Sequence, residues 1–302
     1  PAPKAGRGAS WYAGGMLAPY CERESAEEPV VTHGREALGW WREQLPGLVH
    51  SNGTLVVAPE RDRSELDRFA ARTSGYVRLD GDGIAALEDD LAGRFNAGLH
   101  FADEGHLDPR LALDGLADKL GERGVDFCLS EGSDDIAEDD FQVVIDCTGF
   151  ARASSDPELR GVRGEMLVLK TVDITLSRPV RMLHPRIPVY IVPRGEDLFM
   201  VGATMIESDA TGPITARSMM ELLNAAYALH PAFGEAEIVE TGTGVRPAYP
   251  DNLPRVFRQD GEIVVNGLYR HGFLLSPWAA RQAARMALET CQSTEPENEA
   301  DR

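Results

Sequence analysis

Cysteine is scarce in this 302-residue chain, which has four copies. They are widely spaced and form no C-x-x-C pair, and this excludes a disulfide scaffold and a zinc site built on paired cysteines. Cys128 and Cys147 lie in apolar runs. We therefore expect both to be buried as small hydrophobic side chains.

Positive charge is also in deficit, with 30 Lys plus Arg against 49 Asp plus Glu and a net charge of −19. A negative protein repels nucleic acid and anionic membrane surfaces, so neither is expected as a partner. No window approaches the ~18 consecutive apolar residues of a membrane span. The first ten residues have no apolar core, so no secretory signal is expected there and the cytoplasm is the expected location.

Several catalytic motifs are missing, including the G-x-S-x-G elbow, the phosphate-binding G-x-x-x-x-G-K-[ST] loop and paired metal-binding histidines. The dinucleotide fingerprint has one match, at residues 81–86 (GDGIAA). A helix N-terminus binds pyrophosphate through its positive N–H groups, but Asp80 and Asp82 would repel a phosphate there. We interpret this segment as an acidic helix cap in a surface turn.

The first half of the chain alternates expected strands and helices, which favours an α/β region. Asp108 followed by Pro109 predicts a helix start, because Asp accepts bonds from free amides and Pro fits the first turn. An acidic loop is expected at 132–140. Helices are expected at 29–45 and 62–74, and strands at 53–59, 75–79, 98–101, 125–129 and 141–149.

The second half reads as a largely antiparallel sheet of short strands separated by turn residues. A helix at 215–229 interrupts it, and a closing helix is expected to start at Ser276-Pro277, again with a cap and a proline. A polar tail follows from about Cys291. The strands are expected at 165–170, 188–193, 198–202, 238–243 and 263–267.

Three segments carry a sharper chemical signal. Small residues at 8–19 would let the backbone approach a large flat ligand, although a tightly packed core turn is an alternative. The run 143–149 ends in Thr-Gly and could place backbone at a cofactor, as strand ends do in open α/β sheets. Taken alone, however, it is better read as an ordinary central strand followed by a turn. The third is a pair of arginines among apolar residues and glycines, Arg246 and Arg270. They suggest a carboxylate clamp, and a structural ion pair is the alternative.

In this order and separation, these segments resemble the D-amino-acid-oxidase-like family of flavin oxidases, and within it the glycine oxidases of thiamine biosynthesis. The resemblance extends from Gly6 to about residue 290. The matching pieces are GRGASWYAGGMLAP, EGHLDPR, VVIDCTG, GVRGEML, VYIVPRGEDLFMVGATM, GVRPAYPDNLP and GLYRHGFLLSPWAAR.

The resemblance implies an α/β (α+β) fold in which a Rossmann-like FAD-binding domain is interleaved with a mostly antiparallel substrate domain. The family opens with a strand, a G-x-G-x-x-G turn and a helix, and this chain is expected to lack that first βαβ unit with its pyrophosphate cradle. The FAD-binding domain is expected to comprise 1–50, 107–162 and 255–302, and the substrate domain 51–106 and 163–254.

The resemblance also implies residue roles. Arg246 would grip the substrate carboxylate, Tyr190 and Arg270 would complete the pocket, and Met205 would form its wall. Leu268 stands where family members often have His. The expected flavin contacts are Ala9, Ser10, Gly14, Gly15, Met16, Thr148, Gly149, Leu268, Tyr269, His271, Gly272, Phe273 and Leu274.

The activity implied is FAD-dependent oxidation of glycine or another small amino acid to the imino acid, with dioxygen as acceptor and hydrogen peroxide as product. The expected partners are this substrate, dioxygen, a second copy of the chain and a thiazole synthase that receives the imine. Two alternatives stay open: a related sarcosine or D-amino-acid oxidase or dehydrogenase, and an inactive, flavin-free fragment.

Overall fold

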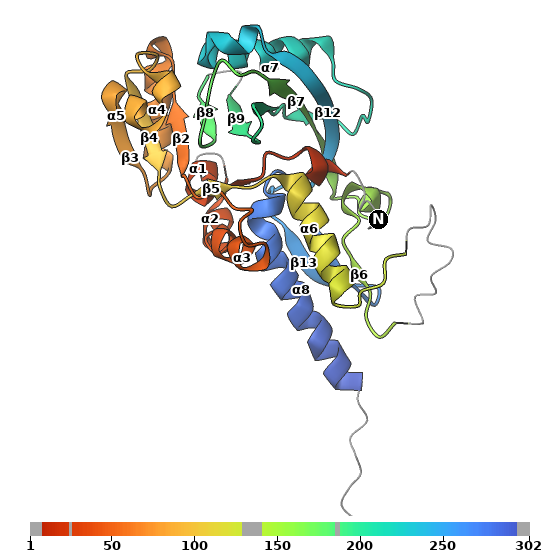
Figure 1. Cartoon of the computed structure of the whole chain (residues 1–302). Helices are drawn as coiled ribbons and strands as arrows, with labels where there is room; N and C mark the ends of the chain where they lie inside the picture. Colours follow the sequence, from red (N-terminus) through yellow and green to blue (C-terminus); the bar gives the residue numbers. More distant parts are fainter. Residues whose placement is uncertain (1–7, 24–25, 129–140, 185–187, 295–302) are drawn as a thin grey trace, which may run out of the picture.

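The computed structural model describes residues 8–23, 26–128, 141–184 and 188–294. Its largest feature is a nine-stranded sheet in the order β11-β7-β10-β9-β8-β2-β4-β3, with β12 also paired to β7 (Figure 1). Most neighbours are antiparallel, and β2 pairs in parallel with β8. The bounds are β2 Thr54–Val57, β3 Val77–Asp80, β4 Ala97–Phe101, β7 Arg160–Lys170, β8 Val180–Met182, β9 Val189–Pro193, β10 Leu198–Gly202, β11 Ile206–Glu207 and β12 Glu237–Ala248.

Two smaller sheets lie outside this one. β1 (Met16–Leu17) pairs with β5 (Gly105–His106), and β14 (Glu262–Asn266) joins β13 (Arg255–Gln259) to β6 (Ile145–Asp146). β6 runs parallel to β14. The mixture of parallel and antiparallel pairs with surrounding helices confirms the expected α/β class.

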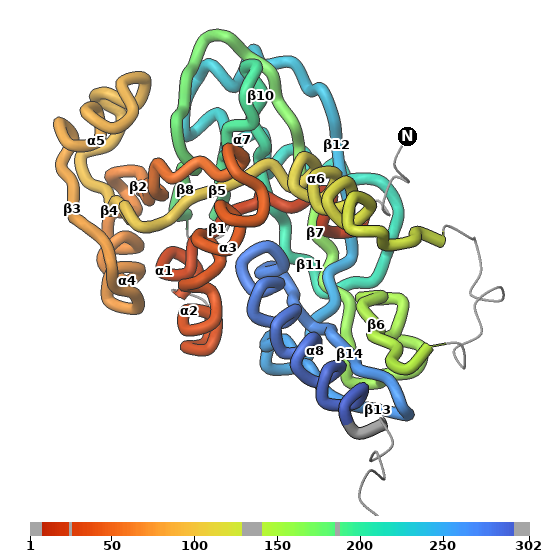
Figure 2. The backbone as a smooth tube through the Cα atoms, turned by 60° about the horizontal axis from the view of Figure 1, so that its bottom comes forward, coloured from red at the N-terminus to blue at the C-terminus, as the bar shows by residue number. Residues whose placement is uncertain are grey.

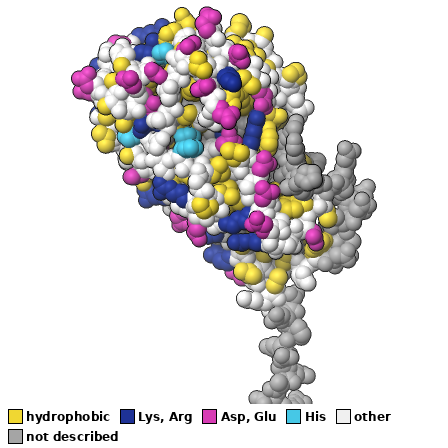
Figure 3. Space-filling model, in the orientation of Figure 1, with side chains coloured by type: hydrophobic (Ala, Val, Ile, Leu, Met, Phe, Trp, Pro, Cys, Tyr) yellow, Lys and Arg dark blue, Asp and Glu magenta, His cyan; other side chains and the backbone are white. Residues whose placement is uncertain are grey.

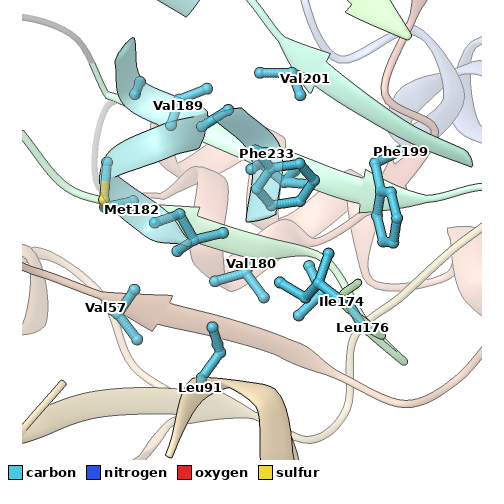
Figure 4. Close-up of a cluster of buried hydrophobic side chains, with 14 of the residues drawn as sticks. Val57, Leu91, Ile174, Leu176, Val180, Met182, Val189, Phe199, Val201 and Phe233 are labelled. Carbon is cyan, nitrogen blue, oxygen red and sulfur yellow. The ribbon is translucent and has the colours of Figure 1, made fainter. Parts of the chain in front are cut away.

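The main core lies between the large sheet and the helix α7 (Ala216–Leu229). The helix buries Leu222, Ala226 and Leu229, while the sheet contributes apolar residues from β2, β8, β9 and β10. Figure 4 shows this cluster, in which Phe199 and Phe233 meet edge to face with ring centroids 5.3 Å apart. Such interdigitated apolar packing makes the sheet a rigid platform for the residues on its other side.

The remaining helices cover the sheet edges and the smaller sheets. No described helix is long and apolar enough to cross a membrane, and on the face in Figure 3 acidic and basic side chains are interspersed. The bounds are α1 Pro19–Glu22, α2 Glu28–Gly34, α3 Ala37–Gln44, α4 Arg63–Arg72, α5 Gly81–Leu87, α6 Pro109–Glu122 and α8 Gly272–Thr294, with 3-10 turns that include η1 Ala9–Tyr12.

The closing helix α8 starts at Gly272, earlier than the expected Ser276-Pro277, so Pro277 lies inside it. A proline there has no N–H to donate to the carbonyl four residues earlier, which belongs to Phe273. The indole Nε1 of Trp41 donates to that carbonyl at 2.8 Å. The long-range bond compensates for the missing one, which is why a helix can continue through this proline.

Several other sequence predictions are confirmed. The helices α4, α6 and α7 and the strands β2 to β4, β7, β9, β10, β12 and β14 lie where expected within a few residues. Asp80 caps α5 by accepting from the amide of Gly83 at 2.9 Å, so the GDGIAA segment is the acidic cap that we predicted. The helix expected over 29–45 is two helices, because a turn at residues 35–36 separates α2 from α3.

The predictions for 125–149 are largely wrong. Residues 125–128 form no strand, and the buried strand expected at 141–149 is reduced to the two residues of β6, with Ile145 exposed. Cys128 and Cys147 are exposed and not buried. An apolar run is buried only where other elements cover it, and here the described elements cover Val143 and Val144 in part and leave Ile145 and Cys147 exposed. The predicted acidic loop at 132–140 lies outside the described residues, as do most of the polar tail residues.

Candidate active site

The small-residue segment near the start of the chain forms a tight loop between η1 and β1. Gly15 has a positive φ of 71°, and a side chain there would collide with Leu107 and with Pro109, whose Cδ would lie 2.9 Å from the added Cβ. A Cβ on Gly14 would lie 2.7 Å from Cε2 of Tyr190. Gly14 therefore allows this loop to lie against Tyr190, a predicted pocket residue, and Gly15 allows it to lie against Leu107 and Pro109;.

Two arginines, Arg194 and Arg110, contact this segment between η1 and β1. Arg194 donates through Nη2 to the carbonyl of Ala13 at 2.7 Å, and its Nη1 lies 3.3 Å from a carboxylate oxygen of Asp108. Arg110 lies over the ring of Trp11 and pairs with both carboxylate oxygens of Glu240 at 2.8 and 2.7 Å. Sequence reasoning missed both arginines, because each acts on residues remote in the chain.

Arg246 extends from β12 into a space that Gly164 of β7 leaves open. A Cβ on Gly164 would lie 2.5 Å from Nη1 of Arg246, so only glycine fits there without displacing the guanidinium. Arg246 donates through Nη1 to the carbonyl of Thr204 at 3.0 Å. The backbone amide of Glu165 donates to the Thr204 hydroxyl at 2.9 Å and so fixes Thr204 in turn.

The guanidinium of Arg246 has no ion-pair partner among the carboxylates of the described residues. Burial is the largest influence on its pKa and lowers it; Tyr190 and Tyr269 oppose this, and the charge of Arg270 reinforces it. Arginine remains charged in proteins nonetheless. A partly buried cation without a carboxylate partner among the described residues is suited to bind an anionic ligand;.

Arg270 lies in the turn between β14 and α8 and is already paired. It donates to Oε2 of Glu22 through Nε at 2.8 Å and also through Nη2. Burial alone would raise the pKa of Glu22, but Arg270, His271 and Arg181 hold it at about 2. Glu22 is thus a carboxylate at neutral pH, and sequence reasoning missed it.

The other predicted pocket residues gather around the two arginines. Met205 receives contacts at its Sδ from the Tyr269 hydroxyl at 3.6 Å and from Nη1 of Arg270 at 3.2 Å. Tyr190, on β9, has its pKa raised by burial, and Arg246 acts on it electrostatically. The structure therefore brings the predicted substrate residues into one cluster, in which Met205 is about half exposed.

The predicted flavin residues at 268–274 surround the start of α8. Figures 1 and 2 place this end of α8 beside β1, although the two lie at opposite ends of the sequence. The side chains of Phe273 and Leu274 are buried in the core, and His271 is buried as well, with its pKa lowered to about 4 chiefly by burial. A Cβ on Gly272 would meet nothing within 4 Å, so the backbone is open there.

Thr148 and Gly149 follow β6 and connect to the same region. The amide and hydroxyl of Thr148 donate to the Asp146 carboxylate at 2.8 and 2.7 Å. The buried Asn266, which sequence reasoning missed, donates to the Gly149 carbonyl at 2.9 Å and accepts from the Gly267 amide at 2.8 Å. Asn266 therefore joins two of the predicted flavin segments. The nearby Ala9 and Ser10 lie in η1, where Ala9 packs on Gly244 of β12.

Comparison with known proteins gives a consistent answer. The model of the DAO family, described as FAD dependent oxidoreductase, matches residues 1–286. The chain belongs to the DAO family of FAD dependent oxidoreductases. It is 63% identical over 284 residues, 94% of this chain, to a Rhizobium etli protein named as the thiamine biosynthesis oxidoreductase ThiO, 86% of which is covered.

Two further similar proteins are informative. The bifunctional protein ThiO/ThiG of a Nostoc species is 32% identical over 136 residues, which cover 44% of this chain and 21% of that protein. The crystal structure of glycine oxidase from Geobacillus kaustophilus matches with a TM-score of 0.78 at 23% identity, covering 95% of this chain and 86% of that one. This likeness establishes the fold.

FAD is the cofactor of this family, and the described residues fit its ring system. The first N–H groups of a helix lack partners within the helix and carry partial positive charge. At α8 these groups begin at Gly272, where the backbone is open. An electron-rich ring edge fits such a helix end.

Proposed function

We propose that this enzyme oxidises glycine or another small amino acid at its carbon–nitrogen bond, with FAD as the cofactor. The observation that carries the proposal is the partly buried Arg246, which has no ion-pair partner among the carboxylates of the described residues and lies near enough to Tyr190 and Tyr269 to interact with them electrostatically. A guanidinium of this kind matches the carboxylate of an amino acid in charge and geometry. The names of the relatives, ThiO and glycine oxidase, agree with this substrate class.

In this proposal the protein positions and the cofactor supplies the redox chemistry. Flavin, when bound, accepts the hydrogen and two electrons that leave the substrate Cα–N unit. Arg246 holds the carboxylate, which fixes the orientation of Cα. The substrate amine must give up its proton first, since a protonated amine has no lone pair to form the C=N bond. Imino acid that is not transferred to another enzyme hydrolyses to glyoxylate and ammonia, and dioxygen takes up the two electrons together with two protons to give hydrogen peroxide.

The pocket residues favour a small substrate. Tyr190 presses on the Ala13–Gly15 loop from one side, and Met205 lies against Tyr269 and Arg270 on the other. A bulky side chain on the substrate would have to displace one of these groups. We therefore expect glycine, sarcosine and D-alanine to be better substrates than amino acids with large side chains.

The test is peroxide release from the FAD-loaded protein with glycine, sarcosine and D-alanine, in the wild type and in Arg246→Met. Loss of a charge-assisted bidentate contact, roughly 3 kcal/mol, should raise KM about 100-fold. Arg61→Met is a matched control, because Arg61 is 74% exposed and pairs only with its neighbour Asp62 among the described residues. An unchanged KM in Arg246→Met would refute the assigned role, and no turnover of any of the three substrates would refute the function.

We also propose that the imine passes to a thiazole synthase. The ThiO/ThiG protein of Nostoc joins two such activities by name, and a reactive imine is best transferred before water hydrolyses it. Co-purification of the chain with a thiazole synthase from the same organism would support the transfer, and its absence under crosslinking would count against it.

A further inference from the structure

The pocket contains two arginines, but they differ in what neutralises them. Arg246 has no carboxylate partner in the described part of the chain, whereas Arg270 makes two donor contacts to one oxygen of Glu22. The second oxygen of Glu22 lies 3.7 Å from Nη1 of Arg181. A carboxylate 13% exposed, set between two guanidinium groups, keeps its charge and cancels most of the field that Arg270 would exert on a ligand;.

The two arginines contact neighbouring residues. Nη1 of Arg246 donates to the carbonyl of Thr204 at 3.0 Å, and Thr204 directly precedes Met205 in the chain. Nη1 of Arg270 reaches the Met205 sulfur at 3.2 Å, at the exposed edge of the pocket. A ligand anchored by Arg246 and extended toward Met205 would therefore bring its far end to the Arg270–Glu22 pair.

We propose that Glu22 is the specificity-determining residue that restricts this pocket to amines with a single carboxylate. With Glu22 in place, a second carboxylate would meet another carboxylate at Arg270 and would lose its hydration without gaining a free cation. Without the Glu22 charge, Arg270 becomes a second anchor for amines with two carboxylates. This inference rests on the proposed function, in particular on Arg246 as the first anchor.

Sarcosine and iminodiacetate are the matched probes, since both are N-substituted glycines and iminodiacetate carries the additional carboxylate. The measured quantity is kcat/KM for iminodiacetate divided by kcat/KM for sarcosine. We expect Glu22→Gln, which keeps the size of the side chain and removes its charge, to raise this ratio at least tenfold. A ratio within twofold of the wild type overturns the proposal.

Two further variants separate charge from general disturbance. Glu28→Gln is the matched control, because the Glu28 carboxylate pairs at 3.1 Å with Arg23 on the surface, and it should leave the ratio unchanged. In the double variant Glu22→Gln with Arg270→Gln, the ratio of kcat/KM for iminodiacetate to kcat/KM for sarcosine should return to the wild-type value. A gain that persists in the double variant means that Arg270 is not the second anchor and overturns the proposal.

Inhibition of the wild type keeps the proposal testable if Glu22→Gln does not fold. Acetate and malonate differ by one carboxylate, and we expect malonate to inhibit sarcosine oxidation no better than acetate. A malonate inhibition constant ten times lower than that of acetate would show that a second cation is already available, which overturns the proposal. If instead Arg246→Met leaves the sarcosine KM unchanged, the proposed function itself fails, and this inference fails with it.

Discussion

Gly164→Ala is the sharpest test of how the Arg246 guanidinium is positioned. The added methyl would lie 2.5 Å from Nη1 of Arg246 and similarly close to its other terminal atoms, well inside the distance that unbonded atoms tolerate. The end of an arginine side chain is flexible, so the guanidinium moves and the strand remains. The contact from Nη1 to the Thr204 carbonyl is then lost.

The expected effect is on substrate binding more than on stability. A displaced guanidinium forfeits roughly 1.5–3 kcal/mol of charge-assisted bonding to the substrate carboxylate, which corresponds to a rise in KM of roughly 10- to 150-fold, while kcat falls by less. The melting temperature should change by only a few degrees. The assay is peroxide release at varied glycine concentration, together with thermal unfolding.

Gly161→Ala is the matched control on the same strand. An added Cβ there would lie 2.8 Å from Cγ1 of Val245, 3.0 Å from Cζ of Phe150 and 3.1 Å from Cα of Asp209, and all three are nearer to it than Arg246. It should reduce stability at least as much as Gly164→Ala and leave the glycine KM near that of the wild type. A KM that stays within twofold in Gly164→Ala, or one that rises equally in both variants, would refute the reasoning.

Three other predictions concern the cofactor loop and stability. Arg194→Met removes the bond to the Ala13 carbonyl and should weaken FAD binding, seen as a higher dissociation constant in a flavin fluorescence titration; an unchanged constant would contradict this. Trp41→Phe leaves the Phe273 carbonyl without its donor and should cost about 1–3 kcal/mol in denaturant unfolding. Burial raises the pKa of Glu104 to about 8 from 4.5, so its contribution to stability is complete below pH 4.5 and is lost as the pH rises through 8. Glu104→Gln should therefore melt higher than the wild type at pH 8.5, and the difference should disappear near pH 4.5.

Helices and strands whose ends are marked by capping or turn residues were predictable from the sequence. Asp108 caps α6 as expected, and its Oδ1 accepts from the amides of Arg110 and Leu111 at 2.7 and 3.2 Å. The antiparallel strands β7, β9, β10 and β12 follow from short apolar runs between turn residues. The grouping of the pocket residues was also predictable, because the resemblance to the family aligned Arg246 and Arg270 with its substrate-binding positions.

What could not be predicted depends on partners distant in the chain. Glu22 pairs with a residue 248 positions away, and nothing in its own neighbourhood marks it. The early start of α8 depends on the Trp41 indole, which donates to the Phe273 carbonyl. No sequence pattern around Pro277 indicates this distant donor. The exposure of Ile145 follows from what lies beside β6, and periodicity cannot reveal this.

The ion pair between Glu22 and Arg270 also affects how the pocket forms. It connects α1, near the start of the chain, to the turn that precedes the last helix. On the ribosome, the segment that separates Glu22 from Arg270, 248 positions further along, must be made before this contact can form, and contacts of such sequence separation slow folding;. The nascent chain therefore carries Glu22 without Arg270 while this segment is made, and the pair forms later than contacts between neighbouring elements.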